Sequence, residues 1–396
     1  REAWRGAGGT VHPWSTDDAV PDVDVHVDAL YGTGLHRPPA VEVAALLTAI
    51  AATGKPVLAL DVPSGLAADT GTVPGAVLCA DVTVSFIAAK RGLHTGRAAD
   101  TVGVLELASL DLPATLWEGT QPDATLLAPG HLPPRSRTAH KGTSGHVLAI
   151  GGDRGMAGAI RLCGEAALRA GAGLVSVATR AEHLLALNAA RPELMAHGVA
   201  NGAALAPLLA RATVLALGPG LGQGDWSCGL WRAVLASGKP LVLDADGLNL
   251  LTHESVTFVQ PAVLTPHPGE AARLLGCPVA TIETDRFAAA RALARRYHAV
   301  VVLKGAGSLV AAPEGATAVC PWGNPGMASG GMGDLLTGVI AALMAQGCDA
   351  WRAACLGVGL HARAGDRAAR HGERGLLATD LLAPLRALGN GPDDDE

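Results

Sequence analysis

The sequence predicts two α/β domains, each with a parallel β-sheet covered by helices. The 396 residues are enough for two domains of ordinary size. Hydrophobic residues make up 49% of the chain but aromatic residues only 3%, so the core must be aliphatic, as in many layered α/β proteins. Short apolar runs also alternate with helical segments, which is typical of parallel strands joined by crossover helices.

In the amino-terminal third, apolar runs bounded by Gly, Pro or Asp predict strands, and residues 41–52 predict a helix between the first two. The predicted strands are residues 25–30, 57–61, 82–87 and 103–107. Residues 111–137 are polar, Pro-rich and aperiodic, which indicates a linker or a docked arm. We therefore expect a first domain over residues 1–124 and a second over residues 125–392.

The second domain shows a longer alternation of the same kind. Residues 157–170 predict a helix. Strands are predicted at residues 146–150, 174–178, 213–217, 240–244, 262–265 and 299–303. Glycines or a loop that opens a helix follow each of them, and this arrangement places ligands beyond the carboxyl ends of parallel strands.

Composition and charge argue against several classes of protein. The net charge of −6 is modest and partly carried by a solvated tail, residues 393–396, while basic residues are spread along helices, so no nucleic acid partner is expected. The seven cysteines have neither a CxxC pair nor metal-ligand spacing, which favours a reducing cytoplasm. No segment is long and apolar enough to span a membrane. Because the chain begins at Arg1 without Met, we expect it to be a fragment.

The segment from Asn324 to Asp334 is the strongest candidate for catalysis. Its glycines lead directly into an apolar helical run, residues 335–345, and successive N–H groups at a helix start bind anions such as phosphate. Asp334 could remove the proton from a hydroxyl that attacks phosphorus, while the amides of Gly331 and Gly333 hold the transferred group. The alternative is an ordinary helix cap. The sequence contains no GxxxxGK[ST] motif, so the loop is not of the Walker type.

Other candidates follow predicted strands. Residues 304–308, Lys-Gly-Ala-Gly-Ser, combine a cation, amides and a hydroxyl that suit a nucleotide, although a plain β-turn has the same composition. Residues 218–222 are glycine-rich, so a ligand could approach their backbone closely. His267 is held rigidly between two prolines, although an isolated His is more often structural. The acidic residues of segment 244–249 could hold magnesium, orient a phosphate or cap a helix, and we expect a supporting role.

Taken in order, these motifs resemble the ADP-dependent NAD(P)H-hydrate dehydratases, which have a ribokinase-like layered α/β/α fold. The resemblance covers residues 140–385. Further motifs that carry it are residues 141–146, 151–152, 158–159 and 267–270. It implies a metabolite repair reaction in which ADP phosphorylates the ring hydroxyl of the S form of hydrated NADH or NADPH. Loss of phosphate then restores the nicotinamide and leaves AMP.

The same resemblance implies roles for individual residues. Asp334 would deprotonate the ring hydroxyl of the substrate. The hydrated dinucleotide would contact Ala159, Gly222, His267 and Asp334. ADP, bound with Mg²⁺ as the phosphoryl donor, would contact Lys304, Gly305, Ala306, Gly307, Ser308 and Gly333. An assembly of identical subunits is also implied.

Residues 25–110 resemble the NAD(P)H-hydrate epimerase domain, a Rossmann-like α/β domain, through residues 28–34 and 61–65. The resemblance implies that Asp28 and Ser64 bind K⁺ and that Asp61 is the catalytic carboxylate. The implied substrate contacts are Gly32, Thr33, Gly34, Leu35, His36, Arg37, Pro38 and Asp61. That family also carries an upstream Asn-Asn-Gly-Gly-Asp motif, which is missing here. We therefore expect a partial domain with impaired epimerase activity and an exposed apolar surface.

Two other functions are consistent with the residues alone. A ribokinase-like small-molecule kinase that uses ATP would need the same Asp334 and the same anion-binding loop. A catalytically silent nucleotide-binding protein would not need Asp334 at all. The epimerase-like segment favours the dehydratase over the kinase, because an epimerase acts on the same hydrated cofactor.

Overall fold

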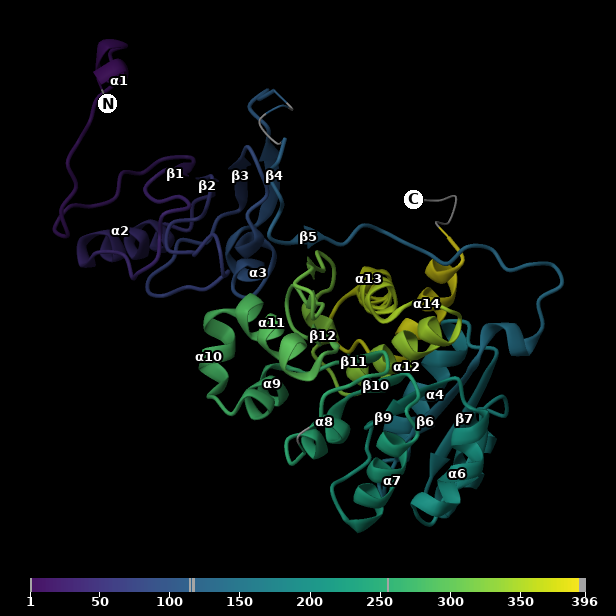
Figure 1. The fold of residues 1–396 in the computed structure, drawn as a ribbon. Helices are drawn as coiled ribbons and strands as arrows, with labels where there is room; N and C mark the ends of the chain where they lie inside the picture. Colours follow the sequence, from purple (N-terminus) through teal and green to yellow (C-terminus); the bar gives the residue numbers. More distant parts are fainter. Residues whose placement is uncertain (1, 114, 116–117, 255, 392–396) are drawn as a thin grey trace. The chain divides into compact units, whose positions relative to one another are not determined.

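The chain forms two compact units, Arg1–Thr120 and Gln121–Glu396, in a computed structural model that describes residues 2–391 except 114, 116–117 and 255 (Figure 1). The acidic tail expected at residues 393–396 lies outside the described residues. Within the described residues, no helix is long and apolar enough to cross a membrane.

In its described residues, the first unit contains a four-stranded parallel sheet in the order β1-β2-β3-β4. The strands are β1 (His26–Asp28), β2 (Val57–Leu60), β3 (Val82–Phe86) and β4 (Val104–Ala108). The crossover between β1 and β2 contains α2 (Val41–Ala52), and two short helices are α1 (Glu2–Gly6) and α3 (Ala98–Thr101). The predicted strands and the predicted helix of this part of the chain are therefore confirmed.

Both edge strands of this sheet expose apolar side chains. Val27 on β1 is 56% exposed, and Val104 and Leu107 on β4 are 60% and 55% exposed. The expected exposed apolar surface is therefore present, and it lies on the edge strands.

In the second unit, ten strands of the described chain form one sheet in the order β5-β14-β13-β12-β11-β10-β9-β6-β7-β8. The strands are β5 (Thr125–Leu126), β6 (His146–Ile150), β7 (Leu174–Thr179), β8 (Met195–Gly198), β9 (Val214–Leu217), β10 (Leu241–Leu243), β11 (Ala262–Leu264), β12 (Val300–Leu303), β13 (Leu309–Ala311) and β14 (Thr317–Val319). The run from β12 to β8 is parallel, and it includes every strand predicted for this domain.

The expectation of an all-parallel sheet is wrong at one edge. β13 pairs antiparallel with both β12 and β14, and β14 pairs parallel with β5. β13 and β14 are three residues each and follow each other as a hairpin, so no crossover helix marks them in the sequence. The linker predicted at residues 111–137 also contributes β5 to the sheet.

Helices cover both faces of the sheet, which confirms the layered α/β/α fold (Figure 1). One face packs against α4 (Ala157–Arg169), α12 (Met332–Ala345), α13 (Ala350–Ala368) and α14 (Leu382–Gly389). The other face packs against α6 (Gly202–Arg211), α7 (Asp225–Ala236), α8 (Ala245–Leu251), α9 (Pro268–Leu275) and α11 (Arg286–Tyr297). Shorter helices are α5 (Leu184–Ala190) and α10 (Val279–Thr284). Alternate residues of β6 belong to opposite core layers, Val147 to the first and Leu148 to the second, as the pleat of a strand requires.

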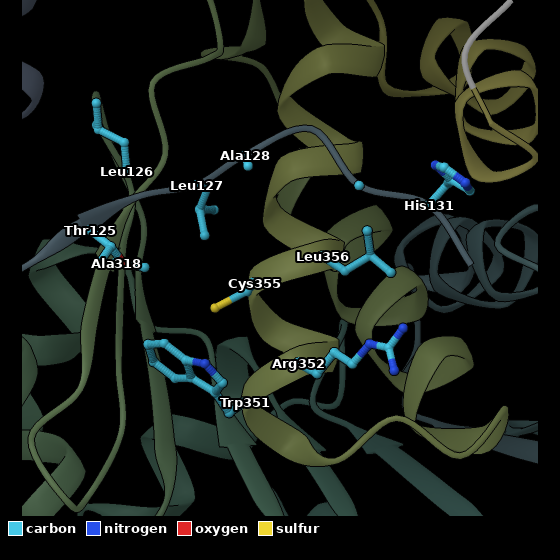
Figure 2. Close-up of a pocket in the computed structure, with 11 residues that line it drawn as sticks. Thr125, Leu126, Leu127, Ala128, His131, Ala318, Trp351, Arg352, Cys355 and Leu356 are labelled. Carbon is cyan, nitrogen blue, oxygen red and sulfur yellow. The ribbon is translucent and has the colours of Figure 1, made fainter. Parts of the chain in front are cut away.

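The arm that carries β5 borders a pocket of about 350 Å³ against α13 (Figure 2). Its wall is mainly apolar and includes Leu127, Trp351 and Leu356, with His131 and Arg352 as polar groups. None of the predicted site residues is among the residues described as lining it. The predicted site must therefore lie elsewhere in the unit.

Candidate active site

The glycine-rich segment before α12 is held at both of its ends. Asp366 on α13 accepts hydrogen bonds from Gly323 N (3.0 Å) and Asn324 Nδ2 (2.9 Å), and the Ser329 hydroxyl donates to the Leu376 carbonyl (3.2 Å). Directly after Ser329, Gly330 is exposed, and a Cβ there would meet no atom within 4 Å. The segment is therefore anchored but leaves open space in front of its backbone.

The start of α12 has the geometry of an anion site. Gly331 is the N-cap residue with a φ of 93°, a left-handed conformation that favours glycine, and a Cβ there would lie 2.5 Å from the Leu162 side chain. No side chain of the described chain caps this helix. The N–H groups of the first turn are thus available to an oxygen anion.

Asp334 lies in this first turn, two residues after helix residue Met332, and Gly331 occupies the cap position instead. The helix-cap interpretation of Asp334 is therefore wrong. Burial, and then the negative charge of Asp244, raise the pKa of Asp334 to about 7, although Lys304 opposes the shift. A carboxylate with a pKa close to neutrality is well matched to work as a general base.

Lys304 lies directly beside this helix start. Its ammonium group pairs with Asp244 Oδ1 at 2.7 Å and lies 3.7 Å from Glu270 Oε2. Burial alone would lower the pKa of Lys304, but the nearby carboxylates of Asp244, Glu270 and Asp334 outweigh it and raise the pKa. A Cβ on Gly333 would lie only 3.2 Å from Lys304 Nζ, so glycine leaves this cation next to the anion site.

Asp244 is the partner that holds Lys304 in place. Only 1% of Asp244 is exposed, and its second oxygen accepts the hydroxyl hydrogen of Thr337 on α12 at 2.9 Å. Burial by itself would raise the pKa of Asp244, but Lys304 and the hydroxyls of Thr265 and Thr337 lower it. Asp244 precedes α8 without a side-chain cap, so the capping alternative is wrong for this residue.

The Gly218–Gly222 loop approaches the start of α4. A Cβ on Gly220 would lie 3.2 Å from Cβ of Ala159, and Gly222 N donates to Asp246 Oδ2 at 2.8 Å. β6 and β9 are neighbours in the sheet, which is why the loops after them meet. Ala159 therefore lies close to the loop that contains Gly222, another predicted substrate contact.

His267 combines a structural role with exposure. It begins α9, where its Nδ1 accepts from Gly269 N at 2.9 Å and its own N–H donates to Glu270 Oε2 at 2.8 Å. Its side chain is nevertheless 51% exposed. Glu270 lies between His267 and Lys304, so one carboxylate connects two of the predicted site residues.

The Lys304–Ser308 segment is also a turn closed by its own hydroxyl. Ser308 Oγ donates to the Gly305 carbonyl at 3.0 Å. Gly305 and Gly307 have φ values of 138° and 61°. Buried Arg286 donates to the Lys304 carbonyl at 3.2 Å and thereby supports the turn from α11. The prediction that this segment forms a turn is therefore confirmed. The Lys304 side chain points from the turn to Asp244.

In the first unit, Asp28 and Ser64 are in direct contact. Asp28 accepts from Ser64 Oγ (2.6 Å) and Ser64 N (2.7 Å), and also from Leu30 N (3.3 Å). The carboxylate is buried, and within the described chain its hydrogen-bond donors are neutral. A buried carboxylate without a cationic partner suits a cation such as K⁺, which would share the Asp28 and Ser64 oxygens.

Asp61 has a strained backbone and a cationic partner that was not predicted. Its φ is 72°, and Oδ1 accepts from Lys90 Nζ at 2.5 Å. A Cβ on Gly32 would lie 3.2 Å from Asp61 Oδ2. Strained non-glycine backbone is concentrated at functional sites. Asp61 and the Gly32 loop therefore lie close together.

The remaining predicted substrate contacts of this unit differ in exposure. Leu35 is buried. The exposed members are Thr33, Gly34, His36, Arg37 and Pro38.

Two family models match the chain. A model described as NAD(P)H-hydrate dehydratase matches residues 147–386, which is more than half of the chain. A model described as the YjeF-related protein N-terminus matches residues 2–92. The two matches fall on the second and the first unit respectively.

Curated relatives match both units at once. The bifunctional NAD(P)H-hydrate repair enzyme of Coxiella burnetii is 50% identical over 372 residues, which cover 93% of this chain and 76% of the relative. The enzyme of the same name from Escherichia coli is 48% identical over 401 residues, with 98% of this chain and 76% of the relative covered.

Solved structures resemble the second unit. An ADP/ATP-dependent NAD(P)H-hydrate dehydratase from Bacillus subtilis, co-crystallised with ATP and Mg²⁺, has a TM-score of 0.59 and 31% identity over 65% of this chain and 93% of its own. A ribokinase-like superfamily protein from Enterococcus faecalis has a TM-score of 0.60 and 31% identity over 64% of this chain and 89% of its own.

The α/β/α layers and the loops at the strand ends thus define the second unit as a ribokinase-like domain. The first unit adds a domain that the curated relatives also contain. The chain belongs to the family of bifunctional NAD(P)H-hydrate repair enzymes.

The raised pKa of Asp334 predicts a gain in stability when its charge is removed. An ordinary aspartate has a pKa of 3.8, whereas that of Asp334 in the fold is about 7. The folded state therefore binds the proton more tightly and loses stability as the pH rises from about 4 to 7. Asp334→Asn should have a higher free energy of unfolding than wild type at pH 8. This gain should shrink as the pH falls below 7, as measured by urea unfolding.

Asp225→Asn is the matched control, because Asp225 is exposed in the first turn of α7. It should give no gain at any pH. Equal stability of wild type and Asp334→Asn across the pH range would contradict the prediction.

Proposed function

We propose that the second unit dehydrates the S form of NADH or NADPH hydrate with ADP as the phosphoryl donor. The ring hydroxyl oxygen attacks the terminal phosphorus of ADP, the bond to the bridging oxygen breaks, and AMP leaves. Phosphate then leaves the ring carbon, and loss of a proton from the neighbouring carbon restores the reduced nicotinamide. The oxygen of the hydrate ends in the released phosphate.

The observation that carries this proposal is the raised pKa of Asp334 at the start of α12. Its carboxylate accepts the proton of the ring hydroxyl as the oxygen bonds to phosphorus. The first-turn amides, including that of Gly333, stabilise the transferred phosphoryl group, and Lys304 adds a positive charge beside them.

The two ligands are proposed to lie on opposite sides of Asp334. Ala159, Gly222 and His267 bind the hydrated dinucleotide, which the proximity of Ala159 to the glycine loop supports. The nucleotide binds at residues 304–308 and Gly333, where glycine leaves the Lys304 ammonium exposed to the anion site.

The charge of the site supports a nucleotide that brings its own cation. Lys304 is surrounded by three carboxylates, those of Asp244, Glu270 and Asp334. These carboxylates oppose the attraction of the helix start for phosphate, so ADP is proposed to bind as its Mg²⁺ complex. Mg²⁺ normally keeps several waters and binds substrate phosphates.

A small-molecule kinase of the same fold is not favoured. The relatives that match along most of this chain are named as hydrate repair enzymes, and the chain carries the additional unit that they contain.

The first unit is proposed as the site of residual epimerase activity. Asp61, which pairs with Lys90, would transfer the proton of the hydrate ring. Asp28 and Ser64 would hold K⁺. The bound K⁺ would supply positive charge near the substrate.

The main test is ADP-dependent recovery of the reduced-nicotinamide absorbance from the S hydrate. Asp334→Asn should lower kcat by about 10²–10⁴ while ADP binding, measured by calorimetry, stays unchanged. For wild type, kcat should rise with pH through about 7 as Asp334 ionises. Full activity of Asp334→Asn would exclude Asp334 as the base.

The donor assignment has its own test. With Mg²⁺ present, we expect kcat/KM for ADP to exceed that for ATP, since only ADP places the reacting phosphorus at the chain end next to the AMP group. A much larger kcat/KM with ATP would overturn the choice of donor and leave the dehydration reaction intact.

The epimerase proposal is tested by following interconversion of the R and S hydrates in K⁺ buffer. Asp61→Asn should lower any measured rate at least tenfold, while the dehydratase rate of the same variant stays at the wild-type level. Loss of both activities would point to misfolding, and an unchanged epimerase rate would remove Asp61 from the mechanism.

A further inference from the structure

The turn that joins β10 to α8 sends two aspartates in different directions. Asp244 directly follows the strand, and Asp246 lies in the first turn of α8. Ala245 between them has a φ of 47°, a left-handed conformation that is strained for a residue with a Cβ. Such strain persists only where the surrounding structure fixes the backbone, and it is common at functional sites.

Asp244 connects the turn to the side of the site proposed for the nucleotide. One oxygen holds Lys304 Nζ at 2.7 Å, and the other holds the Thr337 hydroxyl at 2.9 Å. Thr337 lies one helical turn after Asp334 on α12, and its hydroxyl also contacts the Gly333 carbonyl at 3.1 Å. The carboxylate of Asp244 thus contacts Lys304 directly and is connected through Thr337 to α12, which carries Asp334 and begins at the anion-binding loop.

Asp246 connects the turn to the side proposed for the dinucleotide. Its Oδ2 accepts from Gly222 N at 2.8 Å, and its Oδ1 accepts from Asn249 Nδ2 at 3.1 Å. Asn249 in turn accepts from Arg273 Nε at 3.0 Å, and Arg273 lies on α9, which begins at His267. The chain of hydrogen bonds therefore spans both loops that carry proposed substrate contacts.

The backbone makes this connection rigid. A Cβ on Gly218 would overlap the Asp244 carbonyl oxygen, and one on Gly247 would lie 2.8 Å from the Leu217 carbonyl oxygen. The loop after β9 and the start of α8 therefore touch backbone to backbone. A shift of one would move the other.

We propose that α8 sets the separation of the two halves of the active site, with Asp244 as the positioning residue for Lys304 and α12, and Asp246 as the positioning residue for the Gly222 loop. This inference rests on the proposed dehydratase function. It predicts that the two aspartates affect different kinetic constants, although only one residue separates them.

The charges around Asp334 determine what loss of Asp244 should do. Asp244, which follows β10, and Lys304, which follows β12, both act on Asp334, while Glu270 on α9 contacts Lys304. Two further groups lie near the cluster, Cys163 on α4 and His361 on α13. Burial raises the pKa of Cys163 and lowers that of His361 to about 4, so both are neutral at pH 7.

Asp246→Asn is the first variant for the test. It keeps the shape of the side chain but replaces a charged acceptor of the Gly222 amide, so the KM for the hydrate should rise about tenfold. The KM for ADP and the pH dependence of kcat should stay at wild-type values. An unchanged KM for the hydrate, with wild type active, would overturn the inference and leave the proposed function intact.

Asp244→Asn should give the complementary result. Without the negative charge of Asp244, Asp334 should ionise more easily. The rise of kcat with pH, which is the acid limb of the pH profile, should therefore occur about one pH unit lower. The KM for the hydrate should stay unchanged. A fall in kcat with an unmoved acid limb would reduce Asp244 to a structural residue and overturn its proposed role.

Two further variants keep the test decisive. If Asp244→Asn does not fold, Asp244→Glu replaces it in the test, because it keeps the negative charge but displaces it. The kcat of Asp244→Glu should fall, and the acid limb of its pH profile should stay in place. A wild-type kcat in this variant would contradict the inference. Glu314→Gln is the control, because Glu314 is exposed in the β13–β14 turn, which lies at the amino-terminal end of β12, away from Lys304. All kinetic constants of this variant should match wild type. Absence of ADP-dependent activity in wild type would instead refute the proposed function.

Discussion

The ion pair between Lys304 and Asp244 is the interaction on which the rest of the site depends. Both groups are largely removed from water, and a buried charge is costly unless it is paired and hydrogen-bonded. Asp244 meets this condition with Lys304 and Thr337. Burial is the main cause of the raised pKa of Asp334, and the charge of Asp244 adds to it, because the Lys304 ammonium group that pairs with Asp244 opposes the shift only in part. The charge of Asp244 thus contributes to the pKa that suits Asp334 to the role of base proposed for it.

The same arrangement explains why glycines are concentrated before α12. A side chain at Gly333 would press on Lys304 Nζ, and one at Gly331 would press on Leu162. The absence of these side chains lets a cation, an anion-binding helix start and a carboxylate share a small volume. The cost is an excess of negative charge, which the fold tolerates by leaving Asp334 partly protonated near pH 7.

Much of the fold was predictable because most strands of both sheets are short apolar runs bounded by Gly, Pro or Asp. Four strands of the second unit were not predicted: β5 and β8 are short strands at the two edges of the sheet, and β13 and β14 form a hairpin without a crossover helix. The site was harder, since Asp244 meets Lys304 and Thr337 across 60 and 93 residues of sequence. Lys90, which holds Asp61, was missed for the same reason. Glu270 was visible only as part of the motif around His267.

Asp334, the proposed base, does not follow a strand. Lys304, Asp244 and His267 all follow parallel strands, and the sheet alone brings such residues to one edge. Asp334 instead lies on α12, which packs on one face of the sheet and is connected to that edge by the Thr337 hydroxyl. The order of the parallel strands therefore brings the proposed binding groups to one edge of the sheet. The position of Asp334, the proposed proton acceptor, depends instead on a specific side-chain contact. That contact ends on Asp244, and α8 joins it to the loop that holds Gly222.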